Sequence, residues 1–268
     1  MSTSAESLAD NPAVLSAADR LWDAAASGEP TAPVRDVLGA SDIQRAYAVQ
    51  NILRGRREDG GARVVGRKIG LTSDAVQKQL GVDQPDFGYL FDDMRHADGG
   101  TVPFADVLQP RVEAEVAFLL AADLDEGPLD LAAVRAAVAY ASPAIEVCGS
   151  RVQDWNISLA DTVADNASAG AFVIGAAQLS LDEVEPAAVS MAMSIDGETV
   201  STGTGADCMG DPLEALAWLA RTARDLGDPL RAGQVILSGA LGAMRPVLPG
   251  STVRAEFTTL GAVEISFS

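Results

Sequence analysis

The sequence predicts an α+β fold, in which a helical N-terminal part (residues 1–60) precedes a β-rich part (residues 61–268). Before residue 60, apolar residues recur at the spacing of one helix face. After residue 60, strand-like segments outnumber helical ones and do not alternate with them regularly, which argues against a doubly wound parallel sheet. The chain has 268 residues, enough to bury a large core without disulfides.

The N-terminal part is predicted to contain two helices. The first covers residues 14–25, where apolar residues follow helical spacing, and a turn at residues 28–30 ends it. The second begins at Ser41, which forms a capping-box pair with Gln44, and ends before the Gly60-Gly61 break.

The β-rich part is predicted from short segments with alternating or β-branched apolar residues. Strands are expected at residues 63–71, 110–120, 143–148, 189–195, 234–238, 252–258 and 262–267, with a hairpin turn at Asp196-Gly197. Two helices interrupt them, one over residues 131–140 and one that begins after an N-cap at Asp211 and has Glu214 at N3. Residues 162–170 are expected to form a polar loop.

Composition limits the classes of partner and site. The chain carries 19 Lys and Arg against 38 Asp and Glu, a net charge of −19, so we expect neither nucleic acid nor membrane as a partner. The single histidine, His96, argues against a His-rich zinc site and against a Ser-His-Asp triad. The charged residues around His96 predict a surface position for it.

Cysteine usage and the N-terminus indicate a cytoplasmic protein. No segment reaches the length of a membrane span, and residues 1–12 lack the pattern of a signal peptide. The two cysteines, Cys148 and Cys208, lie far apart in the sequence without a CxxC motif. We expect both to be buried thiols in a reducing compartment rather than a disulfide or a pair of metal ligands.

Two carboxylates, Glu113 and Glu115, lie two residues apart in an apolar strand, so their side chains share one face. Burying two like charges is costly, and a hard divalent ion such as Mg²⁺ or Mn²⁺ would remove that cost. The alternative is that both glutamates face solvent. Glu183 and Glu185 have the same spacing in the acidic stretch LDEVEP, and we expect that pair to be solvated.

Four further residues carry alternatives that the sequence leaves open. Glu146, alone in PAIEVC, is either a third metal ligand or the partner of Arg151. Lys68, in VVGRKIGLT, is either buried with a lowered pKa or extends its ammonium to solvent. An ordinary turn explains Asp86 in QPDFG, and Ser168 lies in a loop that either caps a helix or binds a ligand.

Several segments, taken together, resemble one family. In chain order they are RKIGLTS, VQKQLGVDQPDFGYLFDDM, QPRVEAEVAF, PAIEVCGSRVQDW, DTVADNASAG and SGALGAM. They are similar to the 2-keto-4-pentenoate (2-hydroxypenta-2,4-dienoate) hydratases of the fumarylacetoacetate hydrolase superfamily, from about residue 40 to the C-terminus. The resemblance implies a mixed β-sandwich-like roll with a helical N-terminal part, and a bound Mg²⁺ or Mn²⁺.

The resemblance also implies an activity and a set of site residues. Glu113, Glu115 and Glu146 match the metal-ligand positions, and Lys68, Asp86 and Ser168 match positions at the substrate site. The implied enzyme is a hydro-lyase that adds water to 2-hydroxypenta-2,4-dienoate, giving 4-hydroxy-2-oxopentanoate, in the meta-cleavage catabolism of aromatic compounds. The family further implies a homo-oligomer and association with a pathway aldolase or decarboxylase.

Three alternative functions follow from the same resemblance. A 4-oxalocrotonate decarboxylase would use the same metal, but that branch tends to lack an acidic residue at the position of Asp86. An acylpyruvate-type C–C hydrolase commonly needs a His–Glu pair, and the only histidine here is His96. A non-catalytic subunit that stabilises a partner enzyme is disfavoured by the complete set of three glutamates.

Overall fold

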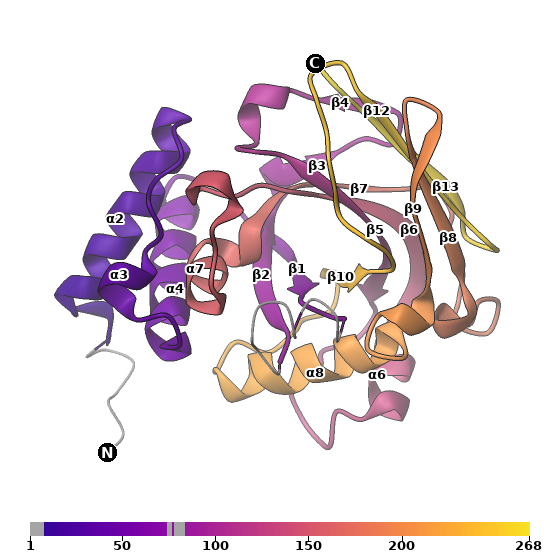
Figure 1. The fold of residues 1–268 in the computed structure, drawn as a ribbon. Coiled ribbons are helices and arrows are strands. Elements are labelled where there is room, and N and C mark those ends of the chain that lie inside the picture. The colour runs from indigo at the N-terminus through magenta and orange to yellow at the C-terminus, as the bar shows by residue number, and fades with distance from the viewer. Residues whose placement is uncertain (1–7, 74–76, 78–83) are drawn as a thin grey trace.

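The structure, a computed structural model, describes residues 8–73, 77 and 84–268 (Figure 1). Residues 1–7, on which part of the signal-peptide expectation rests, lie outside the described residues, as do residues 74–76 and 78–83, most of which belong to one family motif. The N-terminal helices gather on one side of two curled sheets, and two further helices lie beneath those sheets. The predicted α+β fold class is confirmed. Within the described residues, no helix is long and apolar enough to cross a membrane.

The N-terminal helices form a small core of their own against a later segment. These helices are α2 (Pro12–Ser27), α3 (Arg35–Leu38) and α4 (Ile43–Asp59), and they pack with α7 (Leu159–Ala164). Their buried apolar side chains include those of Leu21, Val49 and Val163. The N-terminal helices therefore share their core with α7, a short helix from the middle of the chain. The predicted domain boundary at residue 60 remains a proposal.

The predicted N-cap of α4 is wrong by one residue. The N-cap is Asp42, whose side chain accepts a hydrogen bond from the Arg45 N–H at 3.0 Å, and Ser41 precedes the helix. Asp caps a helix as well as Ser does, and Asp42 is the residue that reaches the N3 amide. Gln44 then falls at N2, where it cannot complete the predicted capping box.

The larger sheet has the strand order β2-β1-β10-β5-β6-β7-β3, with β11 paired to β5 at one end. Its strands are β1 (Val64–Gly70), β2 (Asp86–Phe91), β3 (Arg95–His96), β5 (Arg111–Leu120), β6 (Val138–Cys148), β7 (Ala169–Ile174), β10 (Val235–Ala240) and β11 (Arg245–Pro246). Most pairs are antiparallel, but β1–β10 and β3–β7 are parallel, so the sheet is mixed. His96 pairs with β7 and is half-buried, so it is less exposed than predicted.

The smaller sheet has the order β4-β13-β12-β8-β9 and packs on β6 and β7. Its strands are β4 (Gly100–Val102), β8 (Ser190–Ile195), β9 (Glu198–Thr204), β12 (Thr252–Phe257) and β13 (Gly261–Phe267). The β8–β9 hairpin turns at Asp196-Gly197, as predicted. Helix α8 (Pro212–Asp225) lies along β10 and β1, beside α6 (Leu131–Ala137) (Figure 1). The N-cap of α8 is Asp211, as predicted, and it accepts from Leu213 N–H at 2.8 Å.

Two predicted boundaries in the middle of the chain are wrong. Helix α6 ends at Ala137, and the chain continues directly into β6, so residues 138–140 are strand. Strand pairing sets this boundary, because residues 138–148 of β6 pair with β5. The sequence could not reveal that pairing. The predicted polar loop over residues 162–170 is also wrong, because it contains the end of α7, a 3₁₀ turn at Asn166–Ser168 and the start of β7.

The 3₁₀ turn at Asn166–Ser168 closes the larger sheet into a roll. The Asn166 side chain accepts a hydrogen bond from Tyr89 N–H at 2.7 Å and donates one to the Tyr89 carbonyl at 2.9 Å. This amide therefore substitutes for a neighbouring strand along the edge strand β2. The residues discussed next project into the space that this roll surrounds.

Candidate metal centre

Three carboxylates project from adjacent strands onto one face of the larger sheet. Glu113 and Glu115 lie two residues apart on β5, and Glu146 on β6 is the direct partner of Glu113 in the ladder. Residues directly opposite in an antiparallel pair have their side chains on the same face. The adjacency of these strands, which spacing alone left undecided, brings the three predicted ligand residues together.

The three carboxylates are poorly compensated by the protein around them. Glu115 and Glu146 are fully buried, and Glu113 is half-buried. Glu115 Oε2 accepts a hydrogen bond from Gly239 N–H at 2.7 Å, but Glu115 Oε1 and both oxygens of Glu146 have no hydrogen-bond partner in the described part of the chain. Buried acceptors without donors are rare in folded proteins and point to a missing cation.

Burial raises the pKa of all three glutamates. The pKa of Glu113 rises to about 7, because burial and the neighbouring Glu146 outweigh the opposing effect of Lys68. Burial, followed by Glu146 and Glu113, raises the pKa of Glu115 well above its ordinary value. Burial also raises the pKa of Glu146. The protein alone therefore disfavours three ionised carboxylates, and a cation would restore them.

Lys68 supplies one positive charge to the cluster. Its side chain is buried, its Nζ lies 3.4 Å from Glu146 Oε1, and it donates a hydrogen bond to the Ala167 carbonyl at 3.0 Å. Strands β10 and β5 separate Lys68 on β1 from Glu146 on β6, so the sheet curls toward this face. Burial alone would lower the pKa of Lys68, but Glu146 and its neighbours raise it well above the ordinary value. Lys68 is therefore buried, as one of the two alternatives held, but its pKa is raised rather than lowered.

Asp86 lies diagonally across the strand pair from Lys68. It is the first residue of β2 and is buried, so the explanation by an ordinary surface turn is wrong. Its partner on β1 is Gly70, where a Cβ would lie 2.2 Å from Asp86 Oδ1 and 3.2 Å from Lys68 Nζ. Glycine at this position leaves room for both charged groups. Burial raises the pKa of Asp86, whereas Lys68 opposes that rise.

Ser168 approaches the same space from the 3₁₀ turn. Its Oγ lies 3.3 Å from Thr162 Oγ1, which lies 3.4 Å from Asp86 Oδ2. The backbone here is strained, because Asn166, Ala167 and Ser168 have φ values of 54°, 50° and 57°. Left-handed residues other than glycine cost about 1–3 kcal/mol each, and such strain concentrates at functional sites. The turn places the Ala167 carbonyl and the Ser168 hydroxyl inside the roll.

Arg151 does not pair with Glu146, so that alternative from the sequence is wrong. The Arg151 guanidinium forms an ion pair with Asp165, and its backbone N–H donates to Asp165 Oδ2 at 2.9 Å. Glu183 and Glu185, the comparison pair, are both exposed, as predicted. The two pairs with identical spacing thus differ in burial, which follows from the apolar run behind Glu113 and Glu115.

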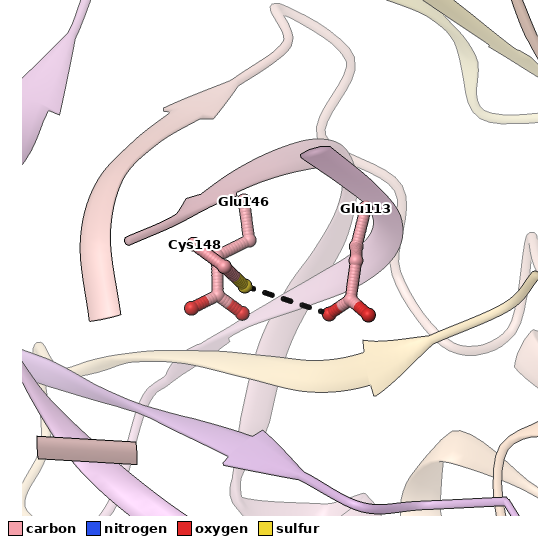
Figure 2. Close-up of side chains that lie close together, drawn as sticks. All are labelled: Glu113, Glu146 and Cys148. Atoms are coloured by element: carbon pink, nitrogen blue, oxygen red, sulfur yellow. Dashed lines mark hydrogen bonds between the residues drawn. The ribbon is translucent and has the colours of Figure 1, made fainter. Parts of the chain in front are cut away.

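Cys148 also belongs to this cluster, which the sequence did not lead us to expect. Both cysteines are free and buried, as predicted, but Cys148 Sγ lies 3.7 Å from Glu113 Oε2. Ligand atoms of Glu113, Glu146 and Cys148 all lie within 4.8 Å of one another, and Figure 2 shows the three side chains together. Cys148 follows Glu146 by two residues in the same strand, so strand alternation could have revealed it.

The residues present fit a divalent cation. Three ionised carboxylates and one ammonium carry a net charge of −2, which a divalent ion neutralises. The donor set is rich in carboxylate oxygens, which hard ions such as Mg²⁺ and Mn²⁺ prefer. The unpartnered oxygens of Glu115 and Glu146 are available as ligands.

Comparisons with known proteins agree with the family that the sequence motifs resemble. The model of the fumarylacetoacetate hydrolase C-terminal family matches residues 67–267. The chain is 51% identical over 251 residues to a 2-keto-4-pentenoate hydratase of Paraburkholderia xenovorans (strain LB400), covering 94% of this chain and 93% of that one. It is 49% identical over 261 residues to a 2-keto-4-pentenoate hydratase of Burkholderia vietnamiensis (strain G4 / LMG 22486), covering 97% and 100%.

The solved structure of a decarboxylase matches over almost the whole chain. This is the 4-oxalocrotonate decarboxylase of Pseudomonas putida G7, complexed with magnesium and adipate, with a TM-score of 0.91 and 34% identity. The match covers 95% of this chain and 97% of that one. This chain therefore belongs to the 2-keto-4-pentenoate hydratase family of the fumarylacetoacetate hydrolase superfamily.

Proposed function

We propose that the protein is a metal-dependent hydratase that converts 2-hydroxypenta-2,4-dienoate into 4-hydroxy-2-oxopentanoate, in the meta-cleavage catabolism of aromatic compounds. The observation that carries this proposal is the buried set of Glu113, Glu115 and Glu146 beside Lys68, with oxygens that lack partners among the described residues. The relatives at about 50% identity are 2-keto-4-pentenoate hydratases, and their activity indicates the substrate class.

We assign the three glutamates as ligands for Mg²⁺ or Mn²⁺. When bound, the ion would provide an electrophilic centre that holds the substrate's carboxylate and C2 oxygen and stabilises negative charge there. The related decarboxylase structure is complexed with magnesium, which supports a divalent ion as the cofactor. The carboxylates of this strongly acidic chain would otherwise repel an anionic substrate, and the ion would neutralise them at the centre.

The protein's own residues would then place and move protons. The substrate ketonises as a proton reaches C5, and water adds at C4. Lys68 stays protonated, so it stabilises the negative charge that develops at the C2 oxygen rather than acting as a base. Asp86 has a raised pKa and an unpartnered Oδ1, so we assign it to moving the proton or orienting the water. The Ser168 hydroxyl, paired with Thr162, positions the substrate.

Three further properties rest on the family resemblance. We propose a homo-oligomer, a cytoplasmic location, and association with an aldolase or decarboxylase of the same catabolic sequence.

A second candidate is 4-oxalocrotonate decarboxylation on the same metal. The TM-score of 0.91 to the decarboxylase of Pseudomonas putida G7 favours it. The identity to that decarboxylase is 34%, against 51% to the hydratase of Paraburkholderia xenovorans. The higher identity and the presence of Asp86 favour the hydratase.

An ultraviolet assay on chelator-stripped protein separates these functions. 2-Hydroxypenta-2,4-dienoate and 4-oxalocrotonate would be added separately, with and without Mg²⁺. Loss of dienoate absorbance that requires Mg²⁺, with 4-hydroxy-2-oxopentanoate formed, supports the hydratase. Release of CO₂ from the dicarboxylate alone would make the protein a decarboxylase, and absence of both reactions would remove both proposals.

A further inference from the structure

Cys148 is a buried thiol that the proposed hydration does not use. It lies on β6 two residues after Glu146, so both side chains project from the same face of the sheet. Cys148 Sγ lies 3.7 Å from Glu113 Oε2, on the neighbouring strand. Figure 2 shows the thiol between the two carboxylates, with Glu113 reaching toward it from β5.

A second observation indicates that this cluster suits a cationic ligand. Both carboxylate oxygens of Glu146 are buried, and neither has a hydrogen-bond partner in the described part of the chain. Ligand atoms of Glu113, Glu146 and Cys148 all lie within 4.8 Å of one another. The Glu146 carboxylate, which makes an ion pair with Lys68 but accepts no hydrogen bond from the described residues, therefore lies beside the thiol.

The spacing of these atoms suits a tetrahedral ion with mixed ligands. Zinc binds sulfur at about 2.3 Å and carboxylate oxygen at about 2.0 Å, so two such ligands of a tetrahedron lie about 3.5 Å apart. The observed separation of Cys148 Sγ and Glu113 Oε2 is 3.7 Å. Only a small shift would bring both atoms to ligand distance from one ion.

We propose that Cys148 gives this centre a second mode of metal binding. A thiophilic divalent ion, such as Zn²⁺ or Cd²⁺, binds through the Cys148 thiolate and the carboxylates of Glu113 and Glu146, and the thiol proton is released to solvent. This inference rests in part on the proposed function, because two of these carboxylates are also assigned to the hard ion. Occupation by a thiophilic ion therefore excludes Mg²⁺ or Mn²⁺.

The two modes differ in what the sulfur contributes. Thiolates select soft or borderline ions, whereas Mg²⁺ prefers oxygen ligands in an octahedron. Removal of the Cys148 sulfur should therefore weaken binding of Zn²⁺ and leave binding of Mg²⁺ nearly unchanged. Loss of a carboxylate, by contrast, should weaken both.

Cobalt substitution tests this directly, because a Co²⁺–thiolate bond gives a charge-transfer absorption in the near ultraviolet. Chelator-stripped protein, kept reduced without added thiols, would be titrated with Co²⁺, and calorimetry would give the affinities for Zn²⁺ and Mg²⁺. The chain has two cysteines, so Cys208→Ala is the matched control for Cys148→Ala and Cys148→Ser. Cys208 is also buried, and its thiol donates to the Ser238 carbonyl at 3.1 Å.

We expect the sulfur absorption in the unmodified protein and in Cys208→Ala, and its loss in both Cys148 variants. We also expect Cys148→Ala to lower the affinity for Zn²⁺ by about tenfold or more, with Mg²⁺ affinity changed by less than about twofold. Because only two cysteines exist, the absorption in Cys208→Ala assigns the sulfur even if the Cys148 variants fail to fold.

The same titrations separate this inference from the proposed function. Bound Co²⁺ without a sulfur absorption, or Zn²⁺ affinity that is unaltered in Cys148→Ala, would overturn the second binding mode. Binding of Mg²⁺ with no sulfur absorption would do so while leaving the hydratase proposal intact. A sulfur absorption in a protein that binds no Mg²⁺ would support the inference and count against the magnesium centre.

Discussion

Lys68 is a buried cation set against buried carboxylates, so its replacement should affect both stability and turnover. In Lys68→Met the Nζ that lies 3.4 Å from Glu146 Oε1 is lost, and buried negative charge stays uncompensated. We expect the metal-free protein to lose about 3 kcal/mol of unfolding free energy. We expect kcat to fall by about 100-fold or more. Urea denaturation and the dienoate assay measure these two effects, and Lys68→Arg, which keeps the charge, should lose less stability. Normal turnover in Lys68→Met would remove Lys68 from the chemistry.

Glu113 should make metal binding dependent on pH. Protons and the ion compete for the same oxygens, and burial raises the pKa of Glu113 to about 7. The metal-free centre therefore holds a proton below that pH, and this proton must leave when the ion binds. We expect the affinity for Mg²⁺ to fall by about tenfold or more per pH unit below pH 7, because Glu113 and Glu115 both have raised pKa values.

Isothermal titration at several pH values, in two buffers with different ionisation enthalpies, measures both the affinity and the protons released. An affinity for Mg²⁺ that stays constant between acid and neutral pH would show that Glu113 is already ionised in the metal-free protein. The variant Glu183→Gln alters an exposed carboxylate and should leave the pH profile unchanged.

Single residues of the site could be predicted where strand alternation applies. Glu113 and Glu115 share a face because they are two residues apart, and a buried run follows them. The opposition of Glu113 and Glu146 could not be predicted, because the register of two strands depends on contacts between segments far apart in sequence. The partner of Arg151 was hidden for the same reason, since Asp165 reaches it only in the folded chain.

At the scale of elements, the turn at Asn166–Ser168 depends on a glycine in β2. Gly88 is the ladder partner of Lys68, and a Cβ at Gly88 would lie 2.2 Å from the Asn166 backbone carbonyl oxygen. Gly88→Ala must therefore displace the turn and weaken the hydrogen bond from Lys68 to the Ala167 carbonyl. We expect a loss of about 2 kcal/mol in unfolding free energy and a reduced kcat.

Gly55→Ala in helix α4 is the matched control for this change. No atom lies within 4 Å of a Cβ built at Gly55, so the extra methyl group meets nothing. Alanine should stabilise the helix by about 0.5–1 kcal/mol relative to glycine. Urea denaturation of the two variants should give changes of opposite sign. Equal stability of Gly88→Ala and the unmodified protein would show that the turn tolerates displacement.

The bounds of helices and strands could be predicted where local sequence signals set them. The predictions were wrong where pairing between distant segments sets the boundary. The N-cap at Asp211 and the hairpin turn at Asp196-Gly197 are local, and both are confirmed. The end of α6 is not local, because the chain passes from helix to strand at Val138 without a turn, and Ala141 N–H donates to the Leu179 carbonyl at 2.8 Å. The left-handed turn at Asn166–Ser168 has no glycine to signal it.

At the scale of the whole molecule, the centre joins strands from distant parts of the chain. Lys68 lies on β1, Glu113 on β5 and Glu146 on β6, and the roll that brings them together is closed by Asn166 on Tyr89. An ion held by Glu113, Glu115 and Glu146 binds the folded chain and not the unfolded one. Metal binding and global stability are therefore linked.

This linkage gives a prediction for thermal unfolding. A ligand at about 100 times its dissociation constant stabilises the folded state by about 2.7 kcal/mol, so Mg²⁺ should raise the melting temperature of the chelator-stripped protein. In Glu113→Gln that increase should largely disappear, because one ligand is lost. In Glu183→Gln it should persist, because Glu183 is exposed and differs from Glu113 in its surroundings rather than its chemistry. The net charge of −19 attracts cations to the surface generally, and equal increases in both variants would mean that Mg²⁺ acts by that non-specific attraction.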